Sequence, residues 1–357
     1  IEGVLLPYHD YLASTGDDEE DARRAELAKE IRVMPGAGEV RQFSFAGEQI
    51  NHDTALSVLG QCLRAVRRVR EHGVASGPWA EREQWLNEQL ARVWGDRGTF
   101  PGFGSALEAM GADLGTAIHH DMLASGVLGA SDDPWRVLDE LSGEEASWPQ
   151  QRYGAEVADA ADIWKRLKQP RKATLNLLSR YNLTPRQARD WYNQYRRKDR
   201  AGTVIQDIEL LRNPYLIAER DGGDDREGPI SFETVDRGIY AGDHVKVYFP
   251  LPAKVEFKTQ SDTRRLRAAI VTVLRQAAEE GDSLLDEREV FARLDPDTTT
   301  SSIDLPPNFF DTHRDNLSGV VDIHEEEPEK HEDSFSDFDD DDDILRRRIV
   351  QLFRYSQ

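Results

Sequence analysis

The amino-acid sequence predicts a mainly α-helical protein, built of helical bundles with a few short strands and one acidic, disordered connector. Apolar residues recur at helical spacing through most of the chain, and residues that cap or begin helices precede several of these runs. Residues 295–343 differ, because they are strongly acidic and poor in core residues over much of their length. Strands are expected only near residues 40–45, at residues 245–249 and in the C-terminal segment.

Length and composition limit the architecture and exclude some classes of site. A chain of 357 residues holds two or three domains with their own cores. Its one cysteine, Cys62, excludes an internal disulfide and a cysteine-rich zinc site. No apolar run approaches the ~20 residues that span a bilayer, and no signal peptide is visible. We therefore expect a soluble, cytoplasmic protein with no membrane partner.

The acidic charge of the chain is concentrated in one segment. Residues 295–343 hold 18 acidic residues against Arg314 and Lys330, a net charge of −16, whereas the whole chain carries −22. Residues 164–200 hold 12 basic residues against Asp190 and Asp199, a net charge of +10. A local basic face on an acidic protein is typical of a surface that contacts phosphate. The alternative is a pair of helices whose charges are simply solvated.

The first predicted domain, residues 1–150, is helical. One helix begins after Asn51 or Asp53, either of which can cap it, and its apolar face continues to Val69. Gly77 and Pro78 precede a second helix, whose apolar stripe we assign to the core. That stripe consists of Trp79, Leu86, Leu90, Val93 and Trp94.

A glycine-containing hairpin is predicted at residues 100–111. The sequence Phe-Pro-Gly-Phe-Gly, which includes Gly102 and Gly104, is followed at once by a helical pattern. Glycines let the backbone turn tightly, and they leave amides at a helix N-terminus open to a phosphate. Gly102 and Gly104 are therefore candidate DNA-binding residues, although a plain glycine turn between two helices is the alternative.

No metal site is expected at His119, His120 and Asp121. Adjacent side chains on a helix point about 100° apart, so two neighbouring histidines do not chelate one ion well. The spacing of the sequence suggests no third ligand.

The basic segment is predicted to form a helical hairpin. Thr184 caps its second helix and Pro185 begins it, while Trp191 is expected in the small core between the helices. Arginines interleaved with aromatic residues can contact phosphate and stack on unpaired bases. The candidate DNA-binding residues of this segment are Lys172, Arg186, Arg189, Tyr195, Arg196, Arg197, Lys198 and Arg200.

Four motifs within residues 173–294 follow one another in a recognisable order. They are Asn182-Leu-Thr-Pro-Arg-Gln-Ala188, Asn213-Pro-Tyr-Leu-Ile-Ala-Glu219, Ile230-Ser-Phe-Glu-Thr-Val-Asp236 and a last motif in two parts, Thr263-Arg-Arg-Leu-Arg-Ala-Ala-Ile-Val271 and Leu274-Arg-Gln-Ala-Ala-Glu-Glu-Gly281. This order resembles the region ahead of the motor in RecD-like ATP-dependent DNA helicases. The resemblance implies helix-hairpin-helix modules and a winged-helix-like accessory domain over residues 151–294.

The chain departs from that family in three places. Ser231 stands where the family usually has glycine, an acidic insertion occupies residues 221–228, and residues 245–249 alternate like a strand. These departures imply that the module keeps its architecture while making fewer contacts with phosphate.

The C-terminal part is predicted to begin with two helices, at residues 262–281 and 286–294, which with a short hairpin form a winged-helix-like bundle. Residues 295–343 are predicted to be an acidic linker, and residues 344–357 the start of a further domain or a closing strand. The segment from about Asp322 to Asp343 is expected to be dispensable for folding.

The motifs that are missing limit the function. The sequence contains no phosphate loop, no H-E-x-x-H and no G-x-S-x-G, so no catalytic residue is predicted. No cofactor is expected in this chain, and ATP with magnesium only if a motor domain follows, as it does in the family. The resemblance implies an accessory region that guides single-stranded or forked DNA to its own helicase core or to a partner. The alternative is a protein-interaction or scaffold module of a DNA-processing or defence complex, with the acidic tail as docking segment.

Overall fold

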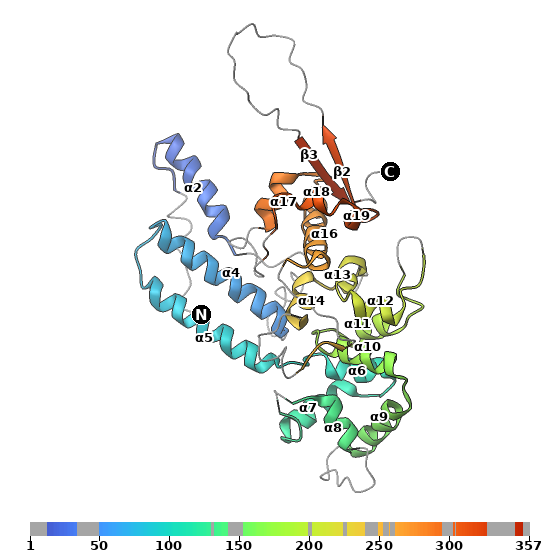
Figure 1. The fold of residues 1–357 in the computed structure, drawn as a ribbon. Helices are drawn as coiled ribbons and strands as arrows, with labels where there is room; N and C mark the ends of the chain where they lie inside the picture. The colour runs from blue at the N-terminus through green and yellow to red at the C-terminus, as the bar shows by residue number, and fades with distance from the viewer. Residues whose placement is uncertain are drawn as a thin grey trace. The chain divides into compact units, whose positions relative to one another are not determined.

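The protein is mainly helical, with one small sheet, which confirms the predicted fold class (Figure 1). This computed structural model describes residues 13–33, 50–129, 132–141, 153–198, 202–223, 227–239, 249–252, 257, 261–294, 303, 305–326 and 347–352. They belong to two compact units, unit 1 at residues 1–256 and unit 2 at residues 257–357. The predicted strand at residues 40–45 lies outside the described residues, as do residues 245–248 of the second predicted strand.

The first core of unit 1 is formed by α2 (Asp18–Ile31) and by a pair of helices that packs against it. Helices α4 (His52–Glu71) and α5 (Trp79–Arg97) lie side by side (Figure 1). Asn51 caps α4 by accepting a hydrogen bond from the Thr54 amide at 2.8 Å, which decides between the two predicted caps. The shared core consists of Ile31, Leu63, Val66, Val69, Trp79 and Leu86. Trp94, predicted in this core, is instead 37% exposed.

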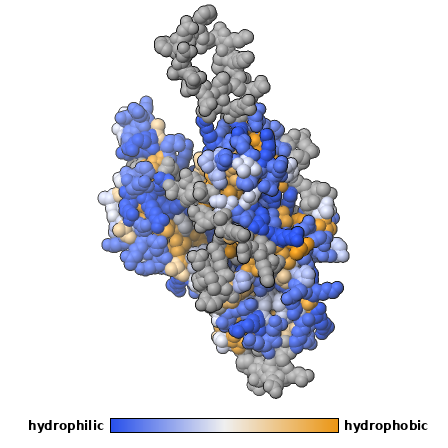
Figure 2. Space-filling view, viewed as in Figure 1, coloured by the Kyte–Doolittle hydropathy of each residue, from blue (hydrophilic) through white to orange (hydrophobic). Residues whose placement is uncertain are grey.

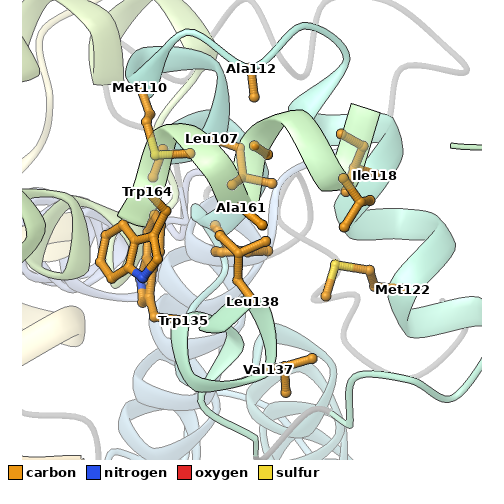
Figure 3. Packing of buried hydrophobic residues seen from close by; sticks show 14 of the residues in the cluster. Leu107, Met110, Ala112, Ile118, Met122, Trp135, Val137, Leu138, Ala161 and Trp164 are labelled. Carbon is orange, nitrogen blue, oxygen red and sulfur yellow. The ribbon is translucent and has the colours of Figure 1, made fainter. Parts of the chain in front are cut away.

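The second core of unit 1 is formed by five consecutive helices. The helices are α6 (Phe103–Met110), α7 (Gly115–Ala124), α8 (Pro134–Leu141), α9 (Gly154–Arg166) and α10 (Gln169–Ser179). Trp135 of α8 and Trp164 of α9 stack at 4.2 Å between ring centroids, within a cluster that also includes Leu175 of α10 (Figure 3). Residues on both sides of position 150 therefore share one core, which differs from the predicted domain boundary there.

The predicted basic hairpin is formed by α10 and α11 (Pro185–Tyr192). The Thr184 hydroxyl accepts a hydrogen bond from the Gln187 amide, and the Gln187 side chain accepts one from the Thr184 amide, so the helix starts with a full capping box. Beyond it lie α12 (Asp207–Arg212), α13 (Leu216–Arg220) and α14 (Phe232–Ile239). Tyr215 and Asp236 join the last pair through a hydrogen bond of 2.5 Å.

The end of α10 and the turn that follows it, residues 179–183, connect several helices of unit 1. The carbonyl oxygens of this segment accept hydrogen bonds from Gly102, Ser105 and Arg97 at 2.9, 2.6 and 3.1 Å. The indole of Trp135 donates a further bond of 2.9 Å to the Ser179 hydroxyl. Because α5, α6 and α8 all form hydrogen bonds to residues 179–183, this segment holds the three helices together.

Buried charges connect the α4–α5 pair to α14. Arg97 forms an ion pair of 2.6 Å with Asp53, and both side chains are almost inaccessible. Arg237 donates hydrogen bonds of 2.8 Å to the Asp53 carbonyl and the Ser57 hydroxyl. Buried charges are tolerated only when they are paired and hydrogen-bonded, so these contacts require a single arrangement of the three helices.

Unit 2 has the element order of a winged helix. Its helices are α16 (Thr263–Glu280), α17 (Glu287–Leu294), α18 (Phe309–Thr312) and α19 (Arg314–Leu317). Strands β1 (Leu285–Asp286), β2 (Val321–Glu326) and β3 (Arg347–Leu352) form an antiparallel sheet in the order β1-β3-β2. The described helices and strands of unit 2 therefore continue to residue 352, beyond residue 294, where the accessory domain is predicted to end.

The prediction of a disordered connector at residues 295–343 is wrong for the described residues 305–326. Phe309, Phe310 and Leu317 are at most 1% exposed, and β2 pairs with β3 along its whole length. Asp322 lies in this strand opposite Gln351, so it is not part of a dispensable tail. The prediction missed the apolar residues of this segment because exposed acidic residues lie between them in the sequence. The strand expected in the C-terminal segment is confirmed as β3.

Candidate nucleic-acid interface

A basic cleft lies on unit 1 beside α11, with a volume of about 560 Å³. It is lined by Ala109, Arg171, Arg186, Arg189, Asp190, Tyr192, Asn193, Gln194, Tyr195 and Arg196. Four arginines against one aspartate make this lining positive, although the whole chain carries −22. We call it the basic cleft. Among the residues that the space-filling view colours, hydrophilic ones are the more common on the visible face (Figure 2).

The capping box and the buried face of α11 position two of these arginines. Ala188 and Trp191 are 1% and 5% exposed, and the Trp191 indole donates a hydrogen bond of 3.1 Å to Asp221. The predicted core role of Trp191 is thereby confirmed. With that face turned inward, Arg186 and Arg189 reach the cleft, and residues three positions apart are neighbours on a helix surface.

Arg171 of α10 contributes a fixed charge to the cleft. Its guanidinium lies 3.5 Å from the ring centroid of Tyr192 and donates hydrogen bonds to the Tyr192 carbonyl at 2.7 Å and to Asp207 at 2.9 Å. These contacts orient Arg171 and cover one face of the Tyr192 ring. The sequence prediction missed both residues, because their pairing crosses from one helix to the other.

The turn that follows α11 presents Tyr195 and Arg196. The Asn193 side chain accepts a hydrogen bond of 3.1 Å from the Tyr195 amide, and the Asn193 carbonyl accepts one of 3.0 Å from the Arg196 amide. Tyr195 is 71% exposed. Arg196 pairs with Asp190, which also lines the cleft, at an exposed position where such a pair adds only ~0–1 kcal/mol.

Arg197 is a correction to the predicted site. It is only 2% exposed and forms an ion pair of 2.5 Å with Asp207. Burial lowers the pKa of Arg197, and Asp207 opposes that effect. A side chain enclosed in this way does not reach a phosphate. Its role is to anchor the turn that carries Tyr195 and Arg196.

Gly102 and Gly104 also lie away from the cleft, so the geometry does not support their expected contact with phosphate. The Gly102 amide donates its hydrogen bond to Ser179, and a Cβ at this position would lie 2.0 Å from the Tyr181 carbonyl oxygen. A Cβ at Gly104 would lie 2.7 Å from the Cα of Thr116. Both glycines allow close packing between backbones instead.

The remaining predicted residues lie apart from the cleft or outside the described part of the chain. The Lys172 ammonium lies 4.7 Å from the ring centroid of Trp164, and Lys198 is exposed and forms an isolated β-bridge with Val204. Neither lines the cleft. Arg200 is not among the described residues. The structure thus brings together Arg186, Arg189, Tyr195 and Arg196 from the prediction.

Neither a metal centre nor a membrane segment is found in the part of the chain that the structure describes. No three histidine, cysteine, aspartate or glutamate side chains there are grouped to hold an ion. Among the described helices, none combines the length and apolarity needed to cross a bilayer.

Acid is expected to destabilise unit 1 through His119. Burial, and secondly the neighbouring His120, lower the pKa of His119 to about 4 from its ordinary 6.5. As the pH falls, the unfolded chain therefore protonates His119 before the folded chain does. The contribution of His119 to the free energy of unfolding is fully present above pH 6.5 and is lost as the pH drops towards 4. The decrease is on the order of 2 kcal/mol. Urea unfolding at pH 7 and pH 4.5 measures it. In a His119→Gln control the dependence should flatten, and equal slopes for both proteins would contradict the assignment.

No match was found for the chain among models of protein families, curated proteins or solved structures. The likeness to RecD-like helicases therefore depends on the four sequence motifs alone. The case for a binding site depends on the geometry of the basic cleft.

Proposed function

We propose that this chain is a DNA-binding accessory region of a RecD-like helicase, which guides single-stranded or forked DNA to an ATPase motor outside these residues. The observation that carries the proposal is the basic cleft, where four arginines from two helices and a turn surround one space. The four ordered motifs supply the link to the helicase family.

Arginine side chains in this arrangement suit phosphate. A guanidinium presents several N–H donors in a planar fork, which matches two phosphate oxygens at once. Arg186 and Arg189 lie at neighbouring positions on one helix, and Arg171, which lines the same cleft, is held in place by Asp207. A positive cleft on an otherwise acidic surface also concentrates the field, and this steers an anionic polymer towards it.

Unit 2 is a less suitable surface for DNA, despite its winged-helix order. Helices α18 and α19 precede the β2–β3 hairpin, the position of the DNA-reading helix in such folds, and they carry Asp311 and Asp315 against Arg314. In the sequence, residues 327–346 between the two strands hold ten acidic residues against Lys330 and Arg346, a net charge of −8. Like charges oppose approach to DNA, which favours the cleft of unit 1.

The proposal is tested by replacing Arg186, Arg189 and Arg196 with alanine. Phosphate binding releases counterions, so the log–log dependence of affinity on salt should flatten by roughly 0.7 for each phosphate that the variant no longer neutralises on single strands. Affinity at fixed salt should fall at least about tenfold for every sequence, because phosphate contacts position DNA without reading bases. Fluorescence anisotropy with labelled oligonucleotides at several salt concentrations measures both quantities.

A matched control removes the same charge elsewhere on unit 1. Arg92, Arg136 and Arg166 are 75%, 69% and 78% exposed, each near an acidic residue four positions away, and none lines the cleft. Their triple alanine variant should bind DNA almost as the native chain does. Arg197 is left unchanged in both variants, because its removal would disturb folding. Unchanged binding by a folded cleft variant would reject the proposal and favour the protein-interaction alternative.

A further inference from the structure

We infer that the basic cleft is a site for single-stranded nucleic acid, in which one unpaired base stacks on Tyr195 while Arg186 and Arg189 contact the adjoining phosphates. The inference rests on the proposed function and deepens it, because it names the form of nucleic acid and the residue that selects it.

The exposure of the Tyr195 side chain is not explained by packing within the fold. At 71% it is the most exposed large hydrophobic side chain in the described part of the chain. Single apolar residues on a surface are common, so exposure alone shows little. The location of Tyr195 carries more weight, because this ring lines the same cleft as four arginines.

The backbone that carries Tyr195 is held on both sides. Asn193 accepts a hydrogen bond from the Tyr195 amide, and two residues later the Arg197 side chain pairs with Asp207 in a buried position. The Arg197 carbonyl also accepts a hydrogen bond of 2.9 Å from the Ile205 amide. A backbone that is already fixed loses little further conformational entropy on binding, so only the Tyr195 side chain has to be ordered when a base stacks on it.

The two tyrosines of the cleft have different roles. The Arg171 guanidinium covers one face of Tyr192, at 3.5 Å from the ring centroid. Tyr195 has no cation–π or ring contact among the described residues, and it is the more exposed of the two. Stacking on an aromatic ring requires the open face of a base, which a base inside a duplex does not offer. The cleft volume of about 560 Å³ lies within the ~300–1,000 Å³ range typical of ligand sites.

The test compares three labelled nucleic acids of equal length by fluorescence anisotropy. They are oligothymidine, an abasic strand with the same phosphates and no bases, and a blunt duplex. The native chain should bind oligothymidine about tenfold more tightly than the abasic strand, the order of one base–aromatic stack, and more tightly than the duplex. Tyr195→Ala should abolish the preference for bases while keeping the salt dependence. Tyr195→Phe should retain the preference, because the ring rather than the hydroxyl makes the contact.

Trp85→Ala, which removes another exposed aromatic at 40%, is the control and should leave all three affinities unchanged. Equal binding of oligothymidine and the abasic strand, with loss of binding in the Arg186, Arg189 and Arg196 variant, would overturn the stacking inference and leave the phosphate cleft intact. Duplex binding as tight as that of oligothymidine would overturn it as well. Binding that none of the arginine replacements affects would reject the proposed function itself.

Discussion

Gly102→Ala is expected to destabilise unit 1 by at least about 3 kcal/mol, because the new methyl group meets backbone rather than a movable side chain. Its Cβ would lie 2.0 Å from the Tyr181 carbonyl oxygen and 3.2 Å from that of Leu178. To relieve the clash, α6 must move away from the turn at residues 179–183, which lengthens the hydrogen bonds from Gly102 and Ser105. The thermal midpoint should fall by roughly 6 to 12 °C or more.

Gly95→Ala provides the matched control, since the chemical change is identical. A Cβ at Gly95, within α5, meets no atom within 4 Å. Alanine favours the helix over glycine by roughly 0.5–1 kcal/mol, so this variant should be slightly more stable than the native chain. If Gly102→Ala kept the native midpoint but weakened DNA binding, the phosphate role predicted for this glycine would regain support over the packing role.

Asp207→Ala is expected to cost about 3–5 kcal/mol, because it leaves Arg197 buried without its charge partner. The Arg197 side chain is 1% exposed, and Asp207 also accepts a hydrogen bond from Arg171 at 2.9 Å. Removal of the carboxylate therefore disturbs both the turn that carries Tyr195 and Arg171 in the lining of the cleft. Chemical unfolding followed by circular dichroism measures the change in unfolding free energy.

The control for this prediction is Asp190→Ala. Asp190 pairs with Arg196, whose side chain is 63% exposed, so removal of that pair should change stability by less than ~1 kcal/mol. It also removes the one acidic residue of the cleft lining, and anion binding should become somewhat tighter. Equal decreases in stability for the two aspartate variants would show that the Arg197–Asp207 pair is not the anchor of the turn.

The candidate site shows where inference from the sequence stops. Arg196 and Arg197 are adjacent in the sequence, which predicts a phosphate contact for both of them equally. The structure exposes the first and buries the second, because a carboxylate ten positions further along the chain, on α12, lies within reach of only one of them. In the same way, Arg171 enters the site through its contact with Tyr192, 21 positions away.

By itself, the sequence determined the helical class, the Thr184–Pro185 start of α11, the core position of Trp191 and the presence of a strand in the C-terminal segment. These features depend on neighbours within about one helical turn or on apolar periodicity, which a linear chain displays directly. Only the tertiary structure decided that Gly102 packs against a backbone and that β2 emerges from an acidic segment. Both outcomes depend on groups that are far apart in the sequence. The first depends on the Tyr181 carbonyl that approaches Gly102, and the second on the pairing of β2 with β3. Local periodicity carries no information about which distant group will be there.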